Sequence, residues 1–243
     1  MGSPRLPDTS FTGIIGTLLH QRGQTMPIEA VIFDMDGVLV DSEEYWWQSR
    51  VEFASALGKT WTMDDQRAAM GRSTIEWAQV MQERLALDMS LDDIMRQVIA
   101  LVMGRIEARL PVLPGAIDAV TLCASRYRVA LASGSPTRVI DTVMRLTGLD
   151  GVFEAILYGD DMKEGKPAPE IYLTTAERLG VDPKRCLGIE DSGNGLRALR
   201  AADMIAIAVP SPGFPLAPDV LALAHHVLPS LEHLTLDVIE GLS

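Results

Sequence analysis

The sequence predicts an α/β fold, a doubly wound parallel sheet with an inserted α-helical cap. Short apolar segments rich in β-branched residues alternate with helical segments along most of the chain. This alternation is typical of a parallel sheet with helices on both faces. One long all-helical segment follows the first predicted strand. At 243 residues the chain suits one large domain or one domain with an insert.

The first predicted strand, 30–33, is the segment around which the rest is organised. It is continuously apolar, as a central parallel strand should be, and it stops at Asp34 and Asp36, followed by the turn residue Gly37. We expect both aspartate side chains to lean the same way off the strand end. Ligands bind at the carboxyl ends of strands in such sheets. The segment therefore predicts a metal-assisted reaction at an aspartate nucleophile.

Residues 43–110 form the predicted helical cap. Apolar residues over 45–57 fit a first helix that ends at Gly58, and those over 75–81 fit a later one. The apolar residues over 91–106 recur at spacings of three and four, which indicates an amphipathic helix. No strand-like alternation interrupts this segment, so we expect it to cover the carboxyl edge of the sheet as a lid.

The alternation resumes in 111–243, which we assign with 28–42 to the core. Further strands are predicted at 129–132, 155–158, 186–189 and 205–209, and helices at 114–125, 169–180, 194–202 and from Pro136 onward. We expect Ser135 to cap the helix that begins at Pro136. The segment after 209 is rich in proline, and we expect it to end in one or two helices.

Residues 1–27 are interpreted as an N-terminal extension that the chemistry does not need. They mix Pro, Ser, Gly and Thr with one apolar run at 14–19, which is too short for a signal peptide. Met26 is a possible second start of the chain.

The charge and composition narrow the possible partners. A net charge of −12 argues against nucleic acid and anionic membranes, which both need a basic face, but leaves room for a small anionic substrate. No segment reaches the roughly 18 apolar residues of a membrane span. Cys123 and Cys186 lie in apolar segments, which favours reduced thiols in a cytoplasmic protein, with one disulfide as the alternative. We expect a monomer, with a dimer as the alternative.

Polar residues also follow the later predicted strands or stand in the loops after them. Ser133 and Gly134 precede a helix, where a hydroxyl and free backbone N–H groups make a phosphate site. Lys166 stands in a proline-rich loop, and Glu190 and Asp191 follow a strand, where carboxylate oxygens suit Mg²⁺. Capping, turns or solvation would explain each cluster alone. Their joint occurrence at one edge of the sheet predicts a functional site.

Electrostatics connects these clusters. A carboxylate that attacks a phosphate meets like charge, and at about 4 Å and an effective dielectric constant near 20 each pair of unit charges repels by roughly 4 kcal/mol. A divalent cation and Lys166 at the same point would offset this repulsion. The nucleophile and a phosphate substrate should therefore coexist only when both cations are present.

The order and spacing of these residues resemble the four motifs of the haloacid dehalogenase superfamily, here 33–38, Ser133, Lys166 and 190–191. The resemblance covers about 28–210. The helical insert resembles the cap of the subfamily that contains β-phosphoglucomutase, phosphoglycolate phosphatase and sugar-phosphate phosphatases. The resemblance implies a Mg²⁺-dependent phosphatase of a small phosphomonoester, with a sugar or polyol phosphate as the first expectation.

The resemblance also implies roles for the acidic residues. Asp34 would be the nucleophile and form an aspartyl-phosphate, and Asp36 would protonate the leaving oxygen and then deprotonate the attacking water. Asp34, the backbone carbonyl of Asp36 and Asp191 would hold Mg²⁺. Glu190 would support these ligands or replace one of them.

The remaining implied contacts are to the substrate. Ser133 and the Gly134 N–H would bind phosphate oxygens, and Lys166 would neutralise developing charge. Further candidates for substrate contact are Glu43, Trp46, Gly71, Arg72 and Ser135.

Other activities of the superfamily fit the sequence less well. Its dehalogenases lack the second aspartate, which is present here as Asp36. Its phosphonatases place a Schiff-base lysine just before a Met-Gly pair in the cap, where this chain has Ala68, and Lys59 is the only lysine of the segment 43–110.

β-Phosphoglucomutase is the main alternative. It has a histidine shortly after the first motif, where Trp46 stands, and tryptophan cannot provide the histidine's proton-coupled gating. It also presents a lysine and an arginine where Arg72 and Thr74 stand here. Trp46 could instead pack the cap or face a sugar. Arg72 could meet a second anionic group or stay solvated. A non-hydrolytic phosphoaspartate switch is a third hypothesis, disfavoured by Asp36 and by the cap, which a switch does not need.

Overall fold

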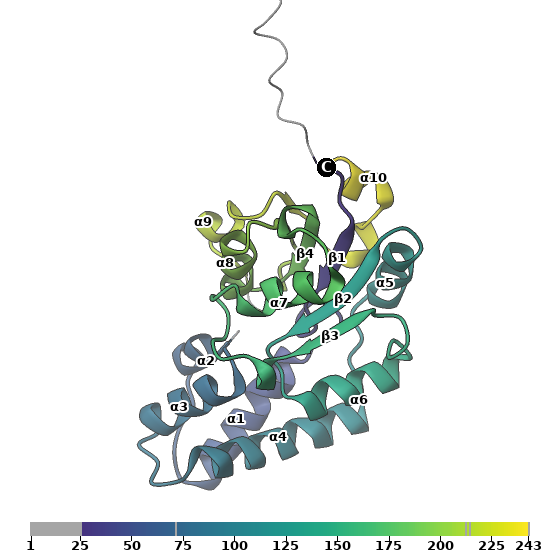
Figure 1. Cartoon of the computed structure of the whole chain (residues 1–243). Coiled ribbons are helices and arrows are strands. Elements are labelled where there is room, and N and C mark those ends of the chain that lie inside the picture. The colour runs from purple at the N-terminus through teal and green to yellow at the C-terminus, as the bar shows by residue number, and fades with distance from the viewer. Residues whose placement is uncertain (1–25, 71, 212, 214, 243) are drawn as a thin grey trace, which may run out of the picture.

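The computed structural model describes residues 26–70, 72–211, 213 and 215–242. In this part of the chain six parallel strands form one sheet in the order β3-β2-β1-β4-β5-β6. The strands are β1 (Ala30–Phe33), β2 (Arg128–Ser133), β3 (Ala155–Tyr158), β4 (Cys186–Glu190), β5 (Ile205–Ala208) and β6 (His226–Val227). β1 pairs with β2 on one side and with β4 on the other. The residues after β1 therefore emerge in the middle of the carboxyl edge (Figure 1).

Helices cover both faces of the sheet, as predicted. The helices that follow β1 are α1 (Glu43–Ala56), α2 (Met63–Ala69), α3 (Thr74–Arg84) and α4 (Leu91–Ala108). The later ones are α5 (Ala116–Ala124), α6 (Thr137–Thr147), α7 (Glu170–Leu179), α8 (Gly193–Ala201), α9 (Pro218–Leu221) and α10 (Leu236–Glu240), with short 3₁₀ turns at Gly159–Asp161, Pro183–Arg185 and Leu231–His233.

Alternate residues of β1 face two separate cores. Val31 and Phe33 pack with α5 and α6, whereas Ala30 and Ile32 pack with α7 and α8. Figure 1 shows α7 and α8 on one side of the sheet and α5 on the other. Burial on both faces explains why the strand is apolar throughout, and it fixes the register that places Asp34 at the edge.

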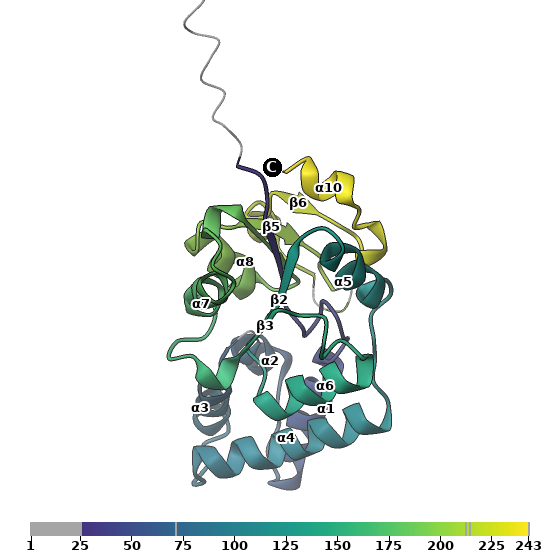
Figure 2. The same cartoon turned by 45° about the vertical axis from the view of Figure 1, so that its right-hand side comes forward.

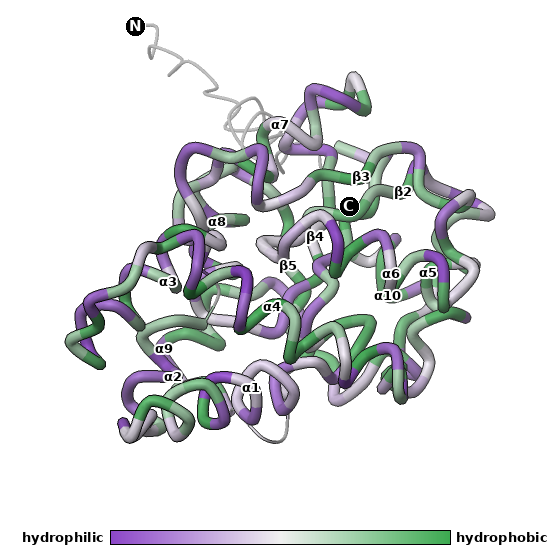
Figure 3. The backbone as a smooth tube through the Cα atoms, turned by 90° about the horizontal axis from the view of Figure 1, so that it is seen from below, coloured by the Kyte–Doolittle hydropathy of each residue, from purple (hydrophilic) through white to green (hydrophobic). Residues whose placement is uncertain are grey.

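We refer to α1–α4 as the cap helices. They lie at the carboxyl edge of the sheet in both views (Figures 1 and 2), and their buried residues continue the core that α5 and α6 share. Hydrophobic and hydrophilic segments alternate along them in Figure 3, as expected of helices with one buried face. Thr62 and Ser73 accept a hydrogen bond from a backbone N–H of the first turn, which fixes the starts of α2 and α3.

The structure corrects the sequence prediction in three places. α6 begins at Thr137 and Pro136 occupies the capping position, so Ser135 is not the cap. The short helix α2 was not predicted separately. The segment after residue 209 contains β6, which two exposed residues form, too few to give a strand pattern. It ends in the short helix α10, which confirms the expected terminal helix.

The sequence also led to predictions about the cysteines, membrane spans and the N-terminal extension. Cys123 and Cys186 are buried free thiols, and burial raises the pKa of each to about 12. Within the described residues, no helix combines the length and the apolar character needed to cross a membrane. The predicted extension 1–27 lies outside the described residues except for Met26 and Pro27.

Candidate active site

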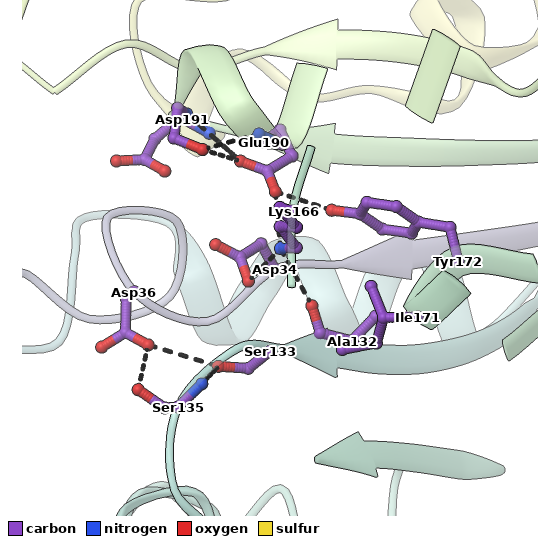
Figure 4. Close-up of polar contacts among 12 residues, drawn as sticks. Asp34, Asp36, Ala132, Ser133, Ser135, Lys166, Ile171, Tyr172, Glu190 and Asp191 are labelled. Carbon is purple, nitrogen blue, oxygen red and sulfur yellow. Dashed lines mark hydrogen bonds and ion pairs between the residues drawn. The ribbon is translucent and has the colours of Figure 1, made fainter. Parts of the chain in front are cut away.

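Asp34 and Lys166 meet at the carboxyl edge of the sheet. The Asp34 N–H donates to the Ile189 carbonyl at 3.1 Å, which keeps the chain paired with β4 just beyond the end of β1. The Lys166 Nζ donates to Asp34 Oδ1 at 2.9 Å and to Glu190 Oε1 at 2.6 Å (Figure 4). All three side chains are buried. The lysine therefore bridges two carboxylates, one just beyond the end of β1 and one at the end of the neighbouring strand β4.

Glu190 anchors this bridge. Its Oε1 also accepts from the Tyr172 hydroxyl at 2.7 Å, and its Oε2 accepts from the backbone N–H groups of Asp191 and Ser192 at 3.1 Å. These N–H groups precede α8, whose N-terminus favours a negative charge. A Cβ on Gly195 would lie 1.8 Å from the Glu190 carboxyl carbon, so a glycine is needed there. Both oxygens of Glu190 thus have protein partners.

Asp34, Glu190 and Asp191 form a cluster that could hold a metal ion, with one oxygen of each lying within 4.8 Å of the others. Gly37 lets Asp191 approach, because its φ is +76° and a Cβ there would lie 2.0 Å from Asp191 Oδ2. Burial raises the pKa of Asp34 to about 8, against the opposing effect of Lys166. Burial also raises the pKa of Asp191 well above its usual value.

These residues fit Mg²⁺. The cluster offers hard carboxylate oxygens, which Mg²⁺ prefers, and a buried negative charge that Lys166 only partly offsets. The raised pKa values of Asp34 and Asp191 reflect the energetic cost of burying their negative charges, and a bound divalent cation would offset that cost.

Asp36 lies in a separate hydrogen-bond network. Its Oδ1 accepts from the Ser42 hydroxyl and from Trp46 Nε1 at 3.2 Å. Its Oδ2 accepts from Ser133 Oγ at 3.2 Å and from Ser135 Oγ at 2.6 Å. Donors from the core and from the cap helix α1 therefore fix the orientation of this carboxylate.

Asp34 and Asp36 line the same cavity, as expected of side chains that lean the same way, but they have different partners. Figure 4 shows Asp36 turned toward Ser133 and Ser135, while Asp34 faces Lys166. β1 ends at Phe33, so both residues lie just beyond the regular strand.

One cavity joins these groups to the cap helices. Its volume is about 50 Å³, enough for a few waters. From the core it is lined by Asp34, Asp36, Gly134, Ser135, Lys166, Asp191 and Ser192, and from the cap segment by Glu43, Trp46, Arg50, Ala69, Met70, Arg72 and Trp77. The predicted candidate Gly71 lies outside the described residues, and Ser133 has no exposed surface.

Several residues of the candidate site were not predicted from the sequence. Tyr172 lies in the first turn of α7 between Ile171 and Leu173, and no local pattern distinguishes its hydroxyl from that of an ordinary core tyrosine. Arg50 and Trp77 come from separate cap helices and meet only in the fold. Ser42 could have been predicted, because it lies only six residues after Asp36, close enough in sequence for its hydroxyl to reach that carboxylate.

A doubly wound parallel sheet that gathers buried acids and a lysine at its carboxyl edge, beneath a helical cap, defines an α/β enzyme built for chemistry on an anionic substrate. The family model of the haloacid dehalogenase-like hydrolases matches residues 28–203. The chain belongs to this family, which confirms the resemblance seen in the sequence.

Similar proteins include two named as phosphatases and one solved structure named as a β-phosphoglucomutase. Hexitol phosphatase B of Escherichia coli O157:H7 is 34% identical over 223 residues, 86% of this chain and 95% of the relative. A phosphorylated carbohydrates phosphatase of Thermotoga maritima is 36% identical over 176 residues, 72% of this chain and 82% of the relative. The crystal structure of β-phosphoglucomutase from Clostridium difficile superimposes with a TM-score of 0.78 and 25% identity, covering 88% of this chain and 96% of that one.

Proposed function

We propose that this chain is a Mg²⁺-dependent phosphatase that hydrolyses a sugar or polyol phosphate through an aspartyl-phosphate. The observation that carries the proposal is the buried Asp34–Lys166–Glu190 array beside Asp191, in one cavity with Asp36. The phosphatase relatives support the reaction type, and the words hexitol and carbohydrates in their names support the substrate class.

In the proposed mechanism Asp34 attacks the phosphorus atom. Asp36 donates a proton to the leaving oxygen and then removes one from the water that cleaves the acyl phosphate. Lys166 neutralises charge on the transferring group, and the Gly134 N–H and Ser133 hydroxyl bind its oxygens. Ser133 would have to exchange its contact with Asp36 for one with the phosphate.

Asp34, Asp191 and the backbone carbonyl of Asp36 would hold Mg²⁺. When bound, the ion would supply positive charge that offsets the repulsion between Asp34 and the phosphate. We assign Glu190 to positioning Lys166, because both of its oxygens already accept hydrogen bonds from the protein.

We further propose that 28–42 and 111–243 form the core, that 43–110 form a cap, and that the cap opens to admit substrate. A cavity of about 50 Å³ is too small for a sugar phosphate, which supports the opening step. We also propose that the protein is a monomer that acts in the cytoplasm and has no nucleic-acid or membrane partner. The buried free thiols and the charge of −12 support this setting.

The decisive experiment measures phosphate release by metal-free protein across a panel of sugar, polyol and short-acid phosphates, before and after Mg²⁺ is added. We expect release on a few related substrates only with Mg²⁺, and its loss on chelation. A panel without any release, or release that is indifferent to Mg²⁺, would contradict the proposal.

The same samples test the mutase alternative, which the similarity to β-phosphoglucomutase keeps open. Trp46 has no titratable group and donates to Asp36, so it holds the acid–base residue but cannot gate it by taking a proton. We therefore expect glucose 1-phosphate either to be hydrolysed or to remain unchanged. Isomerisation without net phosphate release would establish the mutase, and a long-lived aspartyl-phosphate without turnover would establish the switch.

A further inference from the structure

The cap contributes a buried arginine to the cavity. Arg50 of α1 lines the same cavity as Asp34 and Asp36, and only 4% of the residue is exposed. Its guanidinium carbon lies 5.0 Å from the ring centroid of Trp46 and 5.4 Å from that of Trp77. Cation–π contacts with two indole rings hold the guanidinium in place.

The hydrogen-bonding capacity of Arg50 is only partly used. Its Nη1 donates to Gln66 Oε1 at 3.1 Å, but its Nε is buried without a hydrogen-bond partner. None of the ion pairs among the described residues includes Arg50. Glu43 and Asp36 are near enough to act on its charge, but neither forms an ion pair with it, and a buried guanidinium with an unsatisfied donor is costly. Arg50 is nevertheless one of the residues that line the cavity containing Asp34 and Asp36.

An acceptor lies on the same wall. Glu43 also lines the cavity, and its Oε2 accepts from Gln66 Nε2 at 3.4 Å. Gln66 is held from the other side, because its Oε1 also accepts from Trp61 Nε1 at 3.0 Å. Burial raises the pKa of Glu43 to about 7 and lowers that of Arg50 to about 10. Both groups would therefore gain from a polar partner within the cavity.

We propose that Arg50 and Glu43 are a specificity-determining pair that binds hydroxyl groups of the substrate beyond its phosphate. An alcohol fits both, because its oxygen accepts from Arg50 while its hydrogen is donated to Glu43. The rings of Trp46 and Trp77 supply an apolar wall for the carbon chain. A second anionic group would satisfy Arg50 but would meet the Glu43 carboxylate. The inference rests on the proposed phosphatase function and specifies what its cap recognises.

The test compares two substrates with the same number of carbons, D-glucitol 6-phosphate and n-hexyl phosphate. We expect Arg50→Gln to lower kcat/KM for glucitol 6-phosphate by about 10- to 100-fold, the usual effect of losing hydrogen bonds to a charged group. For hexyl phosphate, which has no hydroxyl to bind, we expect a change below about 3-fold. The control Arg96→Gln removes an exposed cap arginine and should change neither value.

Other outcomes would overturn the inference. An equal loss on both substrates would assign Arg50 to packing of the cap. A larger loss on glucitol 1,6-bisphosphate than on glucitol 6-phosphate would mean that Arg50 binds an anion. If Arg50→Gln does not fold, Arg50→Lys keeps the charge and the stem but loses the planar fork, and about a 5-fold or greater selective loss is still expected.

Calorimetry separates this inference from the proposed function. Both ligands are titrated into Asp34→Asn protein, which needs no turnover, with and without Arg50→Gln. Tighter binding of glucitol 6-phosphate that disappears with Arg50→Gln supports the pair even if wild-type protein releases no phosphate. Equal binding of the two ligands refutes the pair even if the phosphatase is active.

Discussion

Replacing Asp34 by asparagine is expected to lower phosphate release by about 10⁴-fold or more, the scale seen when a covalent nucleophile is removed. An amide oxygen carries no charge and is a poor nucleophile, so the acyl phosphate cannot form. The fold should persist, because Lys166 keeps Glu190 as its ion-pair partner and the side-chain volume hardly changes. Initial rates with Mg²⁺ and a thermal melt of the same protein check both statements.

A matched control tests whether the lower rate comes from losing the nucleophile or merely from losing a negative charge near the site. Asp161→Asn removes one exposed carboxylate near the carboxyl edge and should leave both the rate and the melting temperature unchanged. Substantial turnover by Asp34→Asn, within about tenfold of wild type, would mean that water attacks the substrate directly.

Replacing Lys166 by methionine should affect stability as well as activity. The change leaves Asp34 and Glu190 buried without a cation between them, and breaking a buried pair from one side costs about 3–5 kcal/mol. For a chain of this size this corresponds to a fall in Tm of roughly 6–20 °C. The rate should fall by about 10²- to 10³-fold, because one charge that stabilises the transferring group is lost.

Thermal melts with and without Mg²⁺ check the stability effect. Mg²⁺ should raise the Tm of Lys166→Met more than that of wild type, since the ion would partly replace the missing charge beside Asp34. Lys163→Met, an exposed lysine of the same loop, is the control and should change neither property. A Lys166→Met protein with wild-type stability in the absence of metal would show that the two carboxylates do not need the lysine.

The core of the fold was predictable because burial imposes a simple pattern. β1, β2 and β4 are covered on both faces and therefore read as short apolar runs. β6 lies at the edge with two exposed residues, so no such pattern exists for it. Acids directly after buried strands stand out in the sequence, which is why Asp34 and Asp191 were found.

The cap side of the cavity was only partly predictable. Arg50, Gln66 and Trp77 come from different helices, and their meeting depends on how those helices pack. Packing of an amphipathic helix specifies which face is buried but not which polar groups of other helices it meets. Trp46 was found as a candidate through the family comparison, but its hydrogen bond to Asp36 depends on the turn after β1.

The covalent intermediate on Asp34 is the central claim, and chemical trapping tests it most directly. Protein turning over D-glucitol 6-phosphate with Mg²⁺ is quenched rapidly, reduced with borohydride and examined by peptide mass spectrometry. Borohydride converts an aspartyl-phosphate into homoserine, so we expect homoserine at position 34 only when substrate is present. Steady phosphate release with unmodified aspartate at position 34, or homoserine at position 36 instead, would contradict it.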